Sequence, residues 1–290
     1  KFTKNLATAV GISKTGSSIA LLVFAPLTQL MLDTYGWRGT MLLVGGTSFH
    51  LAVCGALMIT TDKNTRHTND YHVVQQDDIQ TEAESIRHCC SCWKFVFRNL
   101  DFELLGNLRY WAAAVICCCS YASFDMWTIF FVSMAQSKGF SLEDAAIIVT
   151  IAGVGNLLSK TQGFFVDRLI SSYWGPMCIL ICISSTVFYA TPWLNAFWPL
   201  ALSTFVLFFC HGLSACLQEL LFKQILGADL LVGLYGWLGI NIALVYFSIN
   251  FIPGLIYDLS GSYDGAFIFI GVVVSVPLIP LLIMRCTKIV

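Results

Sequence analysis

Ionisable side chains within long apolar stretches are the residues of this sequence best placed to do chemistry. Lys160 lies in such a stretch, and Asn156 precedes it by four residues, so both project from one face of a helix. Inserting a charged side chain into a membrane costs roughly 2.5–3.5 kcal/mol, so such a residue usually faces a bundle interior or a water-filled cavity. There, Lys160 would attract an anion and Asn156 would donate a hydrogen bond. The alternative is that Lys160 extends to the cytoplasmic interface near Asp167 and Arg168.

Other ionisable residues in apolar stretches have two readings each. Asp125 lies among aromatic residues and is either a proton site or a structural partner of a neighbouring helix. Glu219 and Lys223 have the spacing of an ion pair at a helix end, and the alternative role for Glu219 is to accept a proton. Lys14 shares a helix face with small residues and is either cavity-facing or closely packed.

Membrane-spanning helices must position these residues. The chain has 290 residues, of which 57% are hydrophobic and 11% charged, and this apolar content exceeds what a soluble core of its size could hide. A hydrocarbon core of ~30 Å needs roughly 20 apolar residues in a helix. We expect an all-α, polytopic helical bundle with eight spans near residues 5–32, 39–60, 109–135, 144–167, 172–191, 196–223, 231–257 and 264–284.

Basic residues predict the orientation of these spans, because loops rich in Lys and Arg stay in the cytoplasm. Twelve basic residues fall on the side of Lys1 and Lys4, whereas Arg38 and Lys138 fall on the other. Both ends of the chain are therefore predicted to be cytoplasmic, with residues 61–108 as a polar cytoplasmic loop. The net charge of −1 argues against a nucleic-acid-binding protein.

Three sequence patterns indicate a family, and two of them, YGWRG and SGSYDGAF, are specific. The first span opens with KNLATAVGISKTG from Lys4, and YGWRG follows from Tyr35; near the carboxy terminus, SGSYDGAF runs from Ser260 to Phe267. With these motifs the sequence resembles the monocarboxylate transporter family, a branch of the major facilitator superfamily, in which K-x-x-A-x-A-x-G-x-x-x-x-G opens the fifth of twelve helices and YGWRG introduces the sixth. The resemblance continues through SLEDAA, from Ser141, and covers nearly the whole chain.

The resemblance implies how the chain is organised and what it does. Residues 1–60 would be the last two helices of the amino-terminal half, 61–108 the cytoplasmic loop and 109–290 the six-helix carboxy-terminal half, with four amino-terminal helices absent. It implies a secondary transporter of the plasma membrane that moves small monocarboxylates such as lactate or pyruvate by alternating access, in some members with a proton. It also implies a single-span glycoprotein partner for surface delivery.

The fourth span departs from the family pattern. Members that couple carboxylate to proton carry an acid and an arginine one turn apart there. Anchored on Gly163 and Asp167, those positions are Gly155 and Ser159; shifted by one residue, they are Asn156 and Lys160, so neither alignment keeps the pair. The substrate-binding candidates are therefore Lys160, Asn156, Ser159 and Lys14, and the proton-coupling candidates are Asp125 and Glu219. Gly163, Asp167 and Arg168 resemble the superfamily's cytoplasmic hinge motif, which implies a role in gating.

Two alternatives to a monocarboxylate carrier stay open: a proton-independent facilitated carrier of another small organic solute, and a transport-dead relative acting as a receptor or scaffold. Enzyme motifs are missing from the sequence, and we expect neither a cofactor nor a metal. Most cysteines lie within the predicted spans as small apolar residues. For Cys89, Cys90 and Cys92 beside His88, a metal site, palmitoylation and an inert cluster are the three readings.

Overall fold

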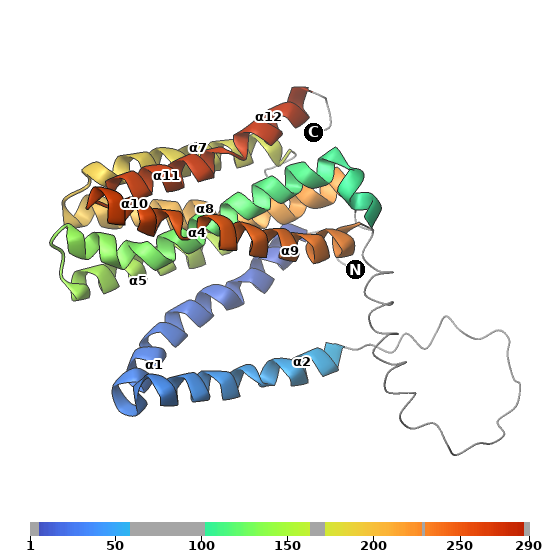
Figure 1. Cartoon of the computed structure of the whole chain (residues 1–290). Helices are drawn as coiled ribbons and strands as arrows, with labels where there is room; N and C mark the ends of the chain where they lie inside the picture. The colour runs from blue at the N-terminus through green and yellow to red at the C-terminus, as the bar shows by residue number, and fades with distance from the viewer. Residues whose placement is uncertain (1–5, 59–101, 163–171, 228–229, 287–290) are drawn as a thin grey trace, which may run out of the picture. The chain divides into compact units, whose positions relative to one another are not determined.

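The computed structural model describes residues 6–58, 102–162, 172–227 and 230–286, and within these ranges every regular element is a helix (Figure 1). The chain divides into two compact units: Lys1–Leu22 together with Arg98–Val290, and Val23–Phe97. The all-α class predicted from the sequence is confirmed. The second unit contains most of α1 (Leu6–Ser48) and all of α2 (His50–Met58).

The first unit is a helical bundle preceded by the start of α1. Its elements are η1 (Phe102–Gly106), α4 (Leu108–Ser137), α5 (Leu142–Lys160), α7 (Trp174–Ala190), η2 (Thr191–Trp193), α8 (Phe197–Leu226), α9 (Leu231–Ile249), α10 (Ile252–Ser260), α11 (Asp264–Ser275) and α12 (Leu278–Cys286). Among the described residues, six segments are long and apolar enough to cross a membrane, and they coincide with the last six predicted spans. The first two predicted spans fall on α1 and α2, which are helical but are not among these six.

Local sequence explains where several helices begin or break. At α5, the Ser141 side chain accepts a hydrogen bond from the Asp144 backbone while the Asp144 carboxylate accepts one from the Ser141 backbone, which is a capping box. Helix α1 is kinked at Gly36, in the YGWRG motif. The φ angle of Gly36 is 66°, which is not helical and which glycine adopts more easily than other residues. The seventh and eighth predicted spans are each interrupted near a proline, at Pro253 and Pro277, because proline cannot donate a backbone hydrogen bond.

Helices α5 and α8 pack closely because glycines line their contact. A Cβ atom at Gly212 would lie 1.9 Å from the Ser159 hydroxyl oxygen, and one at Gly155 would lie 2.7 Å from the Phe205 carbonyl oxygen. Neither position has room for a larger side chain. Small residues that let two backbones approach are the usual way in which membrane helices associate, since lipid supplies no hydrophobic drive between them.

The buried apolar side chains of the bundle form two clusters. One gathers around the beginning of α4 and the end of α8, and includes Tyr110 and Leu217. The other gathers around the second half of α4 and the first half of α8, and includes Phe131 and Leu200. The junction between the clusters therefore lies near the middle of both long helices, which is the level at which a bundle of this kind can hold a cavity.

Lys138, at the end of α4, binds the segment around η2. Its ammonium group donates hydrogen bonds to the carbonyl oxygens of Thr191, Pro192 and Leu194, at 2.8, 2.8 and 3.1 Å. Burial lowers the pKa of Lys138 from its usual value, and nearby Asp264 opposes the shift. The carbonyl groups of η2 and of Leu194 after it thus have a hydrogen-bond donor that the helix itself cannot supply.

Gly212→Ala tests the close contact of α5 with α8. The added methyl group would overlap Ser159, so we expect a loss of stability of about 1–3 kcal/mol, measured as a lower thermal unfolding midpoint of the protein in detergent. Gly239→Ala in α9 is the matched control, since a Cβ atom there meets nothing within 4 Å. Equal midpoints for the two variants would contradict this account of the helix contact.

Candidate functional site

A cavity of about 460 Å³ lies between the start of α1 and helices α4, α5 and α8, at the junction of the two apolar clusters. It is lined by Lys14, Ser18, Ser120, Tyr121, Phe124, Asp125, Asn156, Lys160, His211, Gly212, Ala215 and Gln218. The cavity brings together four predicted site residues: Lys160, Asn156, Lys14 and Asp125. All lie in the first compact unit, although Lys14 and Asp125 come from distant parts of the sequence.

Lys160 and Asn156 share one wall of this cavity and are linked through Ser18. The Lys160 ammonium group donates to the Lys14 carbonyl oxygen at 2.8 Å and to the Ser18 hydroxyl oxygen at 2.7 Å. Ser18 donates in turn to the Asn156 side-chain oxygen at 2.7 Å, and the Asn156 amide donates to the Phe208 carbonyl oxygen at 3.3 Å. These bonds connect α1, α5 and α8 at the cavity wall, with a positive charge at one end.

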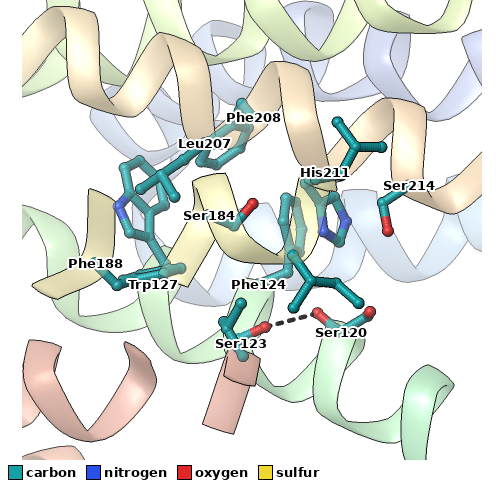
Figure 2. A pocket seen from close by; sticks show the side chains of 13 residues that line it. Ser120, Ser123, Phe124, Trp127, Ser184, Phe188, Leu207, Phe208, His211 and Ser214 are labelled. Atoms are coloured by element: carbon teal, nitrogen blue, oxygen red, sulfur yellow. Dashed lines mark hydrogen bonds between the residues drawn. The ribbon is translucent and has the colours of Figure 1, made fainter. Parts of the chain in front are cut away.

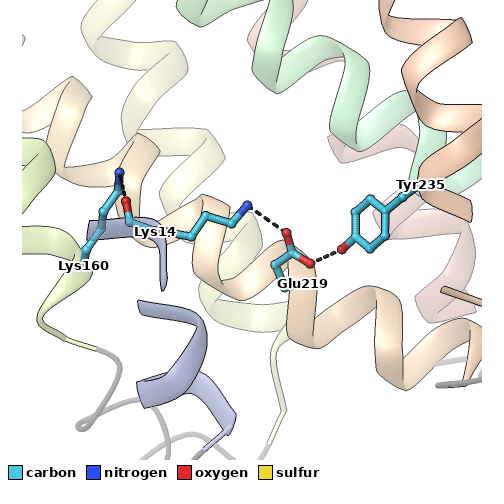
Figure 3. A network of polar contacts seen from close by, with 4 residues as sticks. All are labelled: Lys14, Lys160, Glu219 and Tyr235. Carbon is cyan, nitrogen blue, oxygen red and sulfur yellow. Dashed lines mark hydrogen bonds and ion pairs between the residues drawn. The ribbon is translucent and has the colours of Figure 1, made fainter. Parts of the chain in front are cut away.

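Glu219 forms an ion pair with Lys14, and its carboxylate also accepts a hydrogen bond from the Tyr235 hydroxyl group (Figure 3). The Lys14 nitrogen and the Glu219 oxygen are 2.7 Å apart. The prediction that Glu219 pairs with Lys223 is wrong, because the Glu219 carboxylate pairs with Lys14 of α1. Lys14 borders both the main cavity and a second space of about 290 Å³ that is lined by Val10, Ser13, Lys14 and Glu219. Lys14 is therefore shared by the two spaces, and Glu219 borders the smaller one.

Asp125 lies on the α4 wall of the cavity, half-buried and within reach of the Tyr246 hydroxyl group. On the same helix, Ser120 accepts a hydrogen bond from the Gln218 amide at 2.6 Å. The cavity thus carries the positive charges of Lys14 and Lys160 and a negative charge at Asp125. A solute inside it would meet ionic and neutral hydrogen-bonding groups from four helices.

A smaller pocket of about 50 Å³ adjoins the main cavity (Figure 2). The two share Ser120, Phe124 and His211, and the His211 and Phe124 rings stack with centroids 4.3 Å apart. Trp127 and Phe208 extend the aromatic wall, with their ring centroids 4.5 Å apart and their planes nearly perpendicular. His211 is therefore a packed residue at a shared cavity wall, and aromatic rings limit the size of what can enter the smaller pocket.

Ser159, a predicted substrate-binding candidate, is not among the residues that line the cavity. Its side chain is fully buried against Gly212, and its hydroxyl group donates to the Asn156 carbonyl oxygen at 2.7 Å. Ser159 lies on the side of α5 that touches α8, where Gly212 leaves room for its side chain. The structure gives it a place in helix packing rather than in the lining of the cavity.

Several predictions concern residues outside the described ranges. These are the gating candidates Gly163, Asp167 and Arg168, and the cluster of His88, Cys89, Cys90 and Cys92. The nine cysteines within the described part of the chain are free thiols.

Four polar residues of the cavity network were not predicted from the sequence: Ser18, Ser120, Gln218 and Tyr235. Ser18 follows Lys14 by four residues, so helical spacing alone could have placed it on the same face. Gln218 and Tyr235 gave no such signal, because their partners, Ser120 and Glu219, belong to other helices.

Comparison with known proteins decides the family. A model of the Major Facilitator Superfamily matches residues 2–244. The chain belongs to this superfamily. It is 27% identical to Monocarboxylate transporter 12 of Mus musculus over 286 residues, and 27% identical to Monocarboxylate transporter 12 of Homo sapiens over 285 residues, each match covering 93% of the chain. Over 160 residues, or 53% of the chain, it is 28% identical to Monocarboxylate transporter 2 of Mesocricetus auratus, of which that match covers 32%.

These matches confirm the predicted relationship to the monocarboxylate transporters of the superfamily. They also place the described helices within a multi-pass membrane protein. The chain spans 58% of the length of the mouse relative and 54% of the human one.

A double-mutant cycle tests the ion pair. We expect Glu219→Gln and Lys14→Met each to lower the thermal unfolding midpoint, and the double variant to lose less than the two losses together, with a coupling energy of about 1 kcal/mol. Lys223→Met with Glu219→Gln is the control cycle, for which the losses should add. Coupling of Glu219 to Lys223 instead of Lys14 would overturn the observed pairing.

Proposed function

We propose that this protein is a secondary transporter of small monocarboxylates, such as lactate or pyruvate, across the plasma membrane. The observation that carries the proposal is the cavity at mid-height of α4 and α8, with Lys160 and Asn156 on its wall. A carboxylate there would meet a positive charge and an amide donor within one helix face. The relationship to proteins named as monocarboxylate transporters supports this substrate class.

Alternating access would supply the transport cycle, since carriers of this kind rock two halves about a site near the membrane midplane. In the proposed cycle, the Lys14–Glu219 pair is a barrier between the cavity and the space beside Val10 and Ser13, and it opens when solute passes to that side. Next to this barrier, Lys160 donates hydrogen bonds to Ser18 and to the Lys14 carbonyl oxygen. A carboxylate that binds Lys160 would compete with these bonds and so weaken the closed state of the barrier.

Proton coupling is part of the proposal because an anion that crosses alone works against the membrane potential, at roughly 2.3 kcal/mol per 100 mV. Between the two carboxylates, Asp125 fits the proton site better. It lines the cavity, whereas a proton on Glu219 would have to displace the contact with Lys14. Gly163, Asp167 and Arg168 are proposed to act in gating, as in the superfamily's hinge motif.

The proposed orientation has both ends of the chain in the cytoplasm. Lys223 and Arg285 lie near the ends of α8 and α12, while Lys138 lies at the end of α4 that the orientation assigns to the outside. A single-span glycoprotein partner is proposed for delivery to the cell surface.

Uptake of labelled lactate or pyruvate by the full-length protein in vesicles tests the substrate class. We expect Lys160→Ala to reduce uptake at least tenfold at low substrate concentration, because the positive charge that attracts the carboxylate is lost. Lys223→Ala removes a lysine that does not line the cavity and should transport normally. A wild-type protein that moves no carboxylate would refute the function and leave the receptor or scaffold reading, whereas normal uptake by Lys160→Ala would refute only the site.

Asp125→Asn tests the proton site separately. An inward proton gradient should accelerate uptake by the wild-type protein, and the variant should lose that response while still exchanging labelled for unlabelled substrate. Uptake by the wild-type protein that ignores the gradient would identify a facilitated carrier. A variant that keeps the wild-type response to the gradient would show that the proton binds elsewhere.

A further inference from the structure

An apolar groove of about 300 Å³ runs between α4 and α12, apart from the candidate cavity. Its lining is Leu108, Trp111, Ala112, Val115, Val276, Ile279, Pro280, Ile283 and Met284. The α4 residues recur at intervals of three and four, and so do those of α12 from Ile279 to Met284, so each set forms one stripe along its helix, and Val276 lies in the turn before α12. From Leu108 to Val115 the groove follows α4 for about 10 Å, at ~1.5 Å per residue.

The groove faces away from the bundle. Leu108 and Ile279 are 68% and 59% exposed, and Trp111 and Ile283 are 46% and 49% exposed. In a protein that spans a membrane, an exposed apolar surface of this kind is suited to contact with hydrocarbon. Trp111 is a fixed wall of the groove, because its indole nitrogen donates to the Leu105 carbonyl oxygen at 2.8 Å.

Two arginines are next in the sequence to lining residues at one end of this groove, although neither is a lining residue itself. Arg109 follows the lining residue Leu108, and Arg285 follows the lining residue Met284, at the end where α4 begins and α12 finishes (Figure 1). A guanidinium nitrogen of Arg109 lies 3.4 Å from the Ile225 carbonyl oxygen, and the Arg285 guanidinium lies 5.1 Å from the centre of the Trp174 ring. Trp174 is itself held by a hydrogen bond to the Leu281 carbonyl oxygen. These contacts hold both guanidinium groups at the bundle surface, where both residues are exposed.

We propose that the groove binds one anionic phospholipid, with an acyl chain between α4 and α12 and the phosphate at Arg109 and Arg285. A guanidinium group has five donors, so each arginine can bind a phosphate while keeping its present contact. A partner helix fits the groove less well, because closely packed membrane helices meet at small residues and this groove is walled by Trp111 and large aliphatic side chains. The arginine end is also the one assigned to the cytoplasm, where anionic lipids concentrate.

Binding of phosphatidylserine and phosphatidylcholine with identical acyl chains tests the proposal. The whole protein, purified in detergent, is titrated with each lipid, and bound lipid is counted by native mass spectrometry while the thermal unfolding midpoint is followed. We expect one phosphatidylserine to bind more tightly than phosphatidylcholine and to raise the midpoint. Arg109→Gln and Arg285→Gln should each weaken phosphatidylserine about fivefold and weaken phosphatidylcholine less, because phosphatidylcholine carries the same phosphate but no net negative charge. Arg38→Gln is the matched control, since Arg38 also stacks on a tryptophan, 5.2 Å from the Trp37 ring centre.

Val115→Phe tests the groove itself. The larger ring should fill the space between the helices and weaken both lipids, whereas Ile129→Phe, at an exposed position of the same helix, should weaken neither. If Val115→Phe fails to fold, a phosphatidylserine with a photoactivatable acyl chain replaces it, and the label should map to α4 and α12 of the wild-type protein.

Four results would overturn the proposal. Equal affinity for the two lipids would mean that the arginines recognise no charge, and unchanged binding by Val115→Phe would place the lipid elsewhere. Inorganic phosphate that competes as well as phosphatidylserine would reduce the site to an anion site without a groove. A dimer that Val115→Phe abolishes would assign the groove to a second copy of the chain.

Discussion

The close contact of α5 with α8 is the constraint on which the candidate site depends. Gly155 and Gly212 leave no room for a side chain, so the two backbones approach until Ser159 fills the remaining space. Only at this separation does the Asn156 amide reach the Phe208 carbonyl oxygen. With Ser159 turned toward α8, the same helix turns Asn156 and Lys160 toward the cavity. One packing contact thus sets which residues of α5 can meet a solute.

The cavity then follows from the cost of polar groups in a membrane. A charged or amide side chain in hydrocarbon is stable only when other groups satisfy it, and here the partners come from different helices: Ser18 for Lys160 and Asn156, Glu219 for Lys14, and Ser120 for Gln218. The bonds that make these charges tolerable also join α1 to the carboxy-terminal bundle. In the proposed transport cycle, a ligand that replaced one of these contacts would loosen an interaction between helices and so couple occupancy to conformation.

Individual residues show how much of the candidate site could be predicted from the sequence. Lys160, Asn156 and Asp125 were found because a polar side chain in an apolar helix is conspicuous, and all three line the cavity. Ser159 was proposed from an alignment of motifs, which has no information on which side of α5 touches α8, and it packs against Gly212 of α8. Glu219 was assigned to Lys223 by helical spacing, yet Lys14 is its partner, since a residue from another helix competes with a neighbour one turn away.

The sequence by itself determined the helical class, six of the membrane segments and the family, because each is recorded in local composition, spacing or motif. Apolar length predicts a span wherever it occurs, and a motif is visible without its surroundings. Only the tertiary structure decided which polar groups meet, that Lys14 of the ion pair borders two spaces, and that α4 and α12 leave a groove between them. Each of these depends on the distance between helices that are far apart in the chain, and that distance is set by side-chain packing that no single stretch of sequence contains.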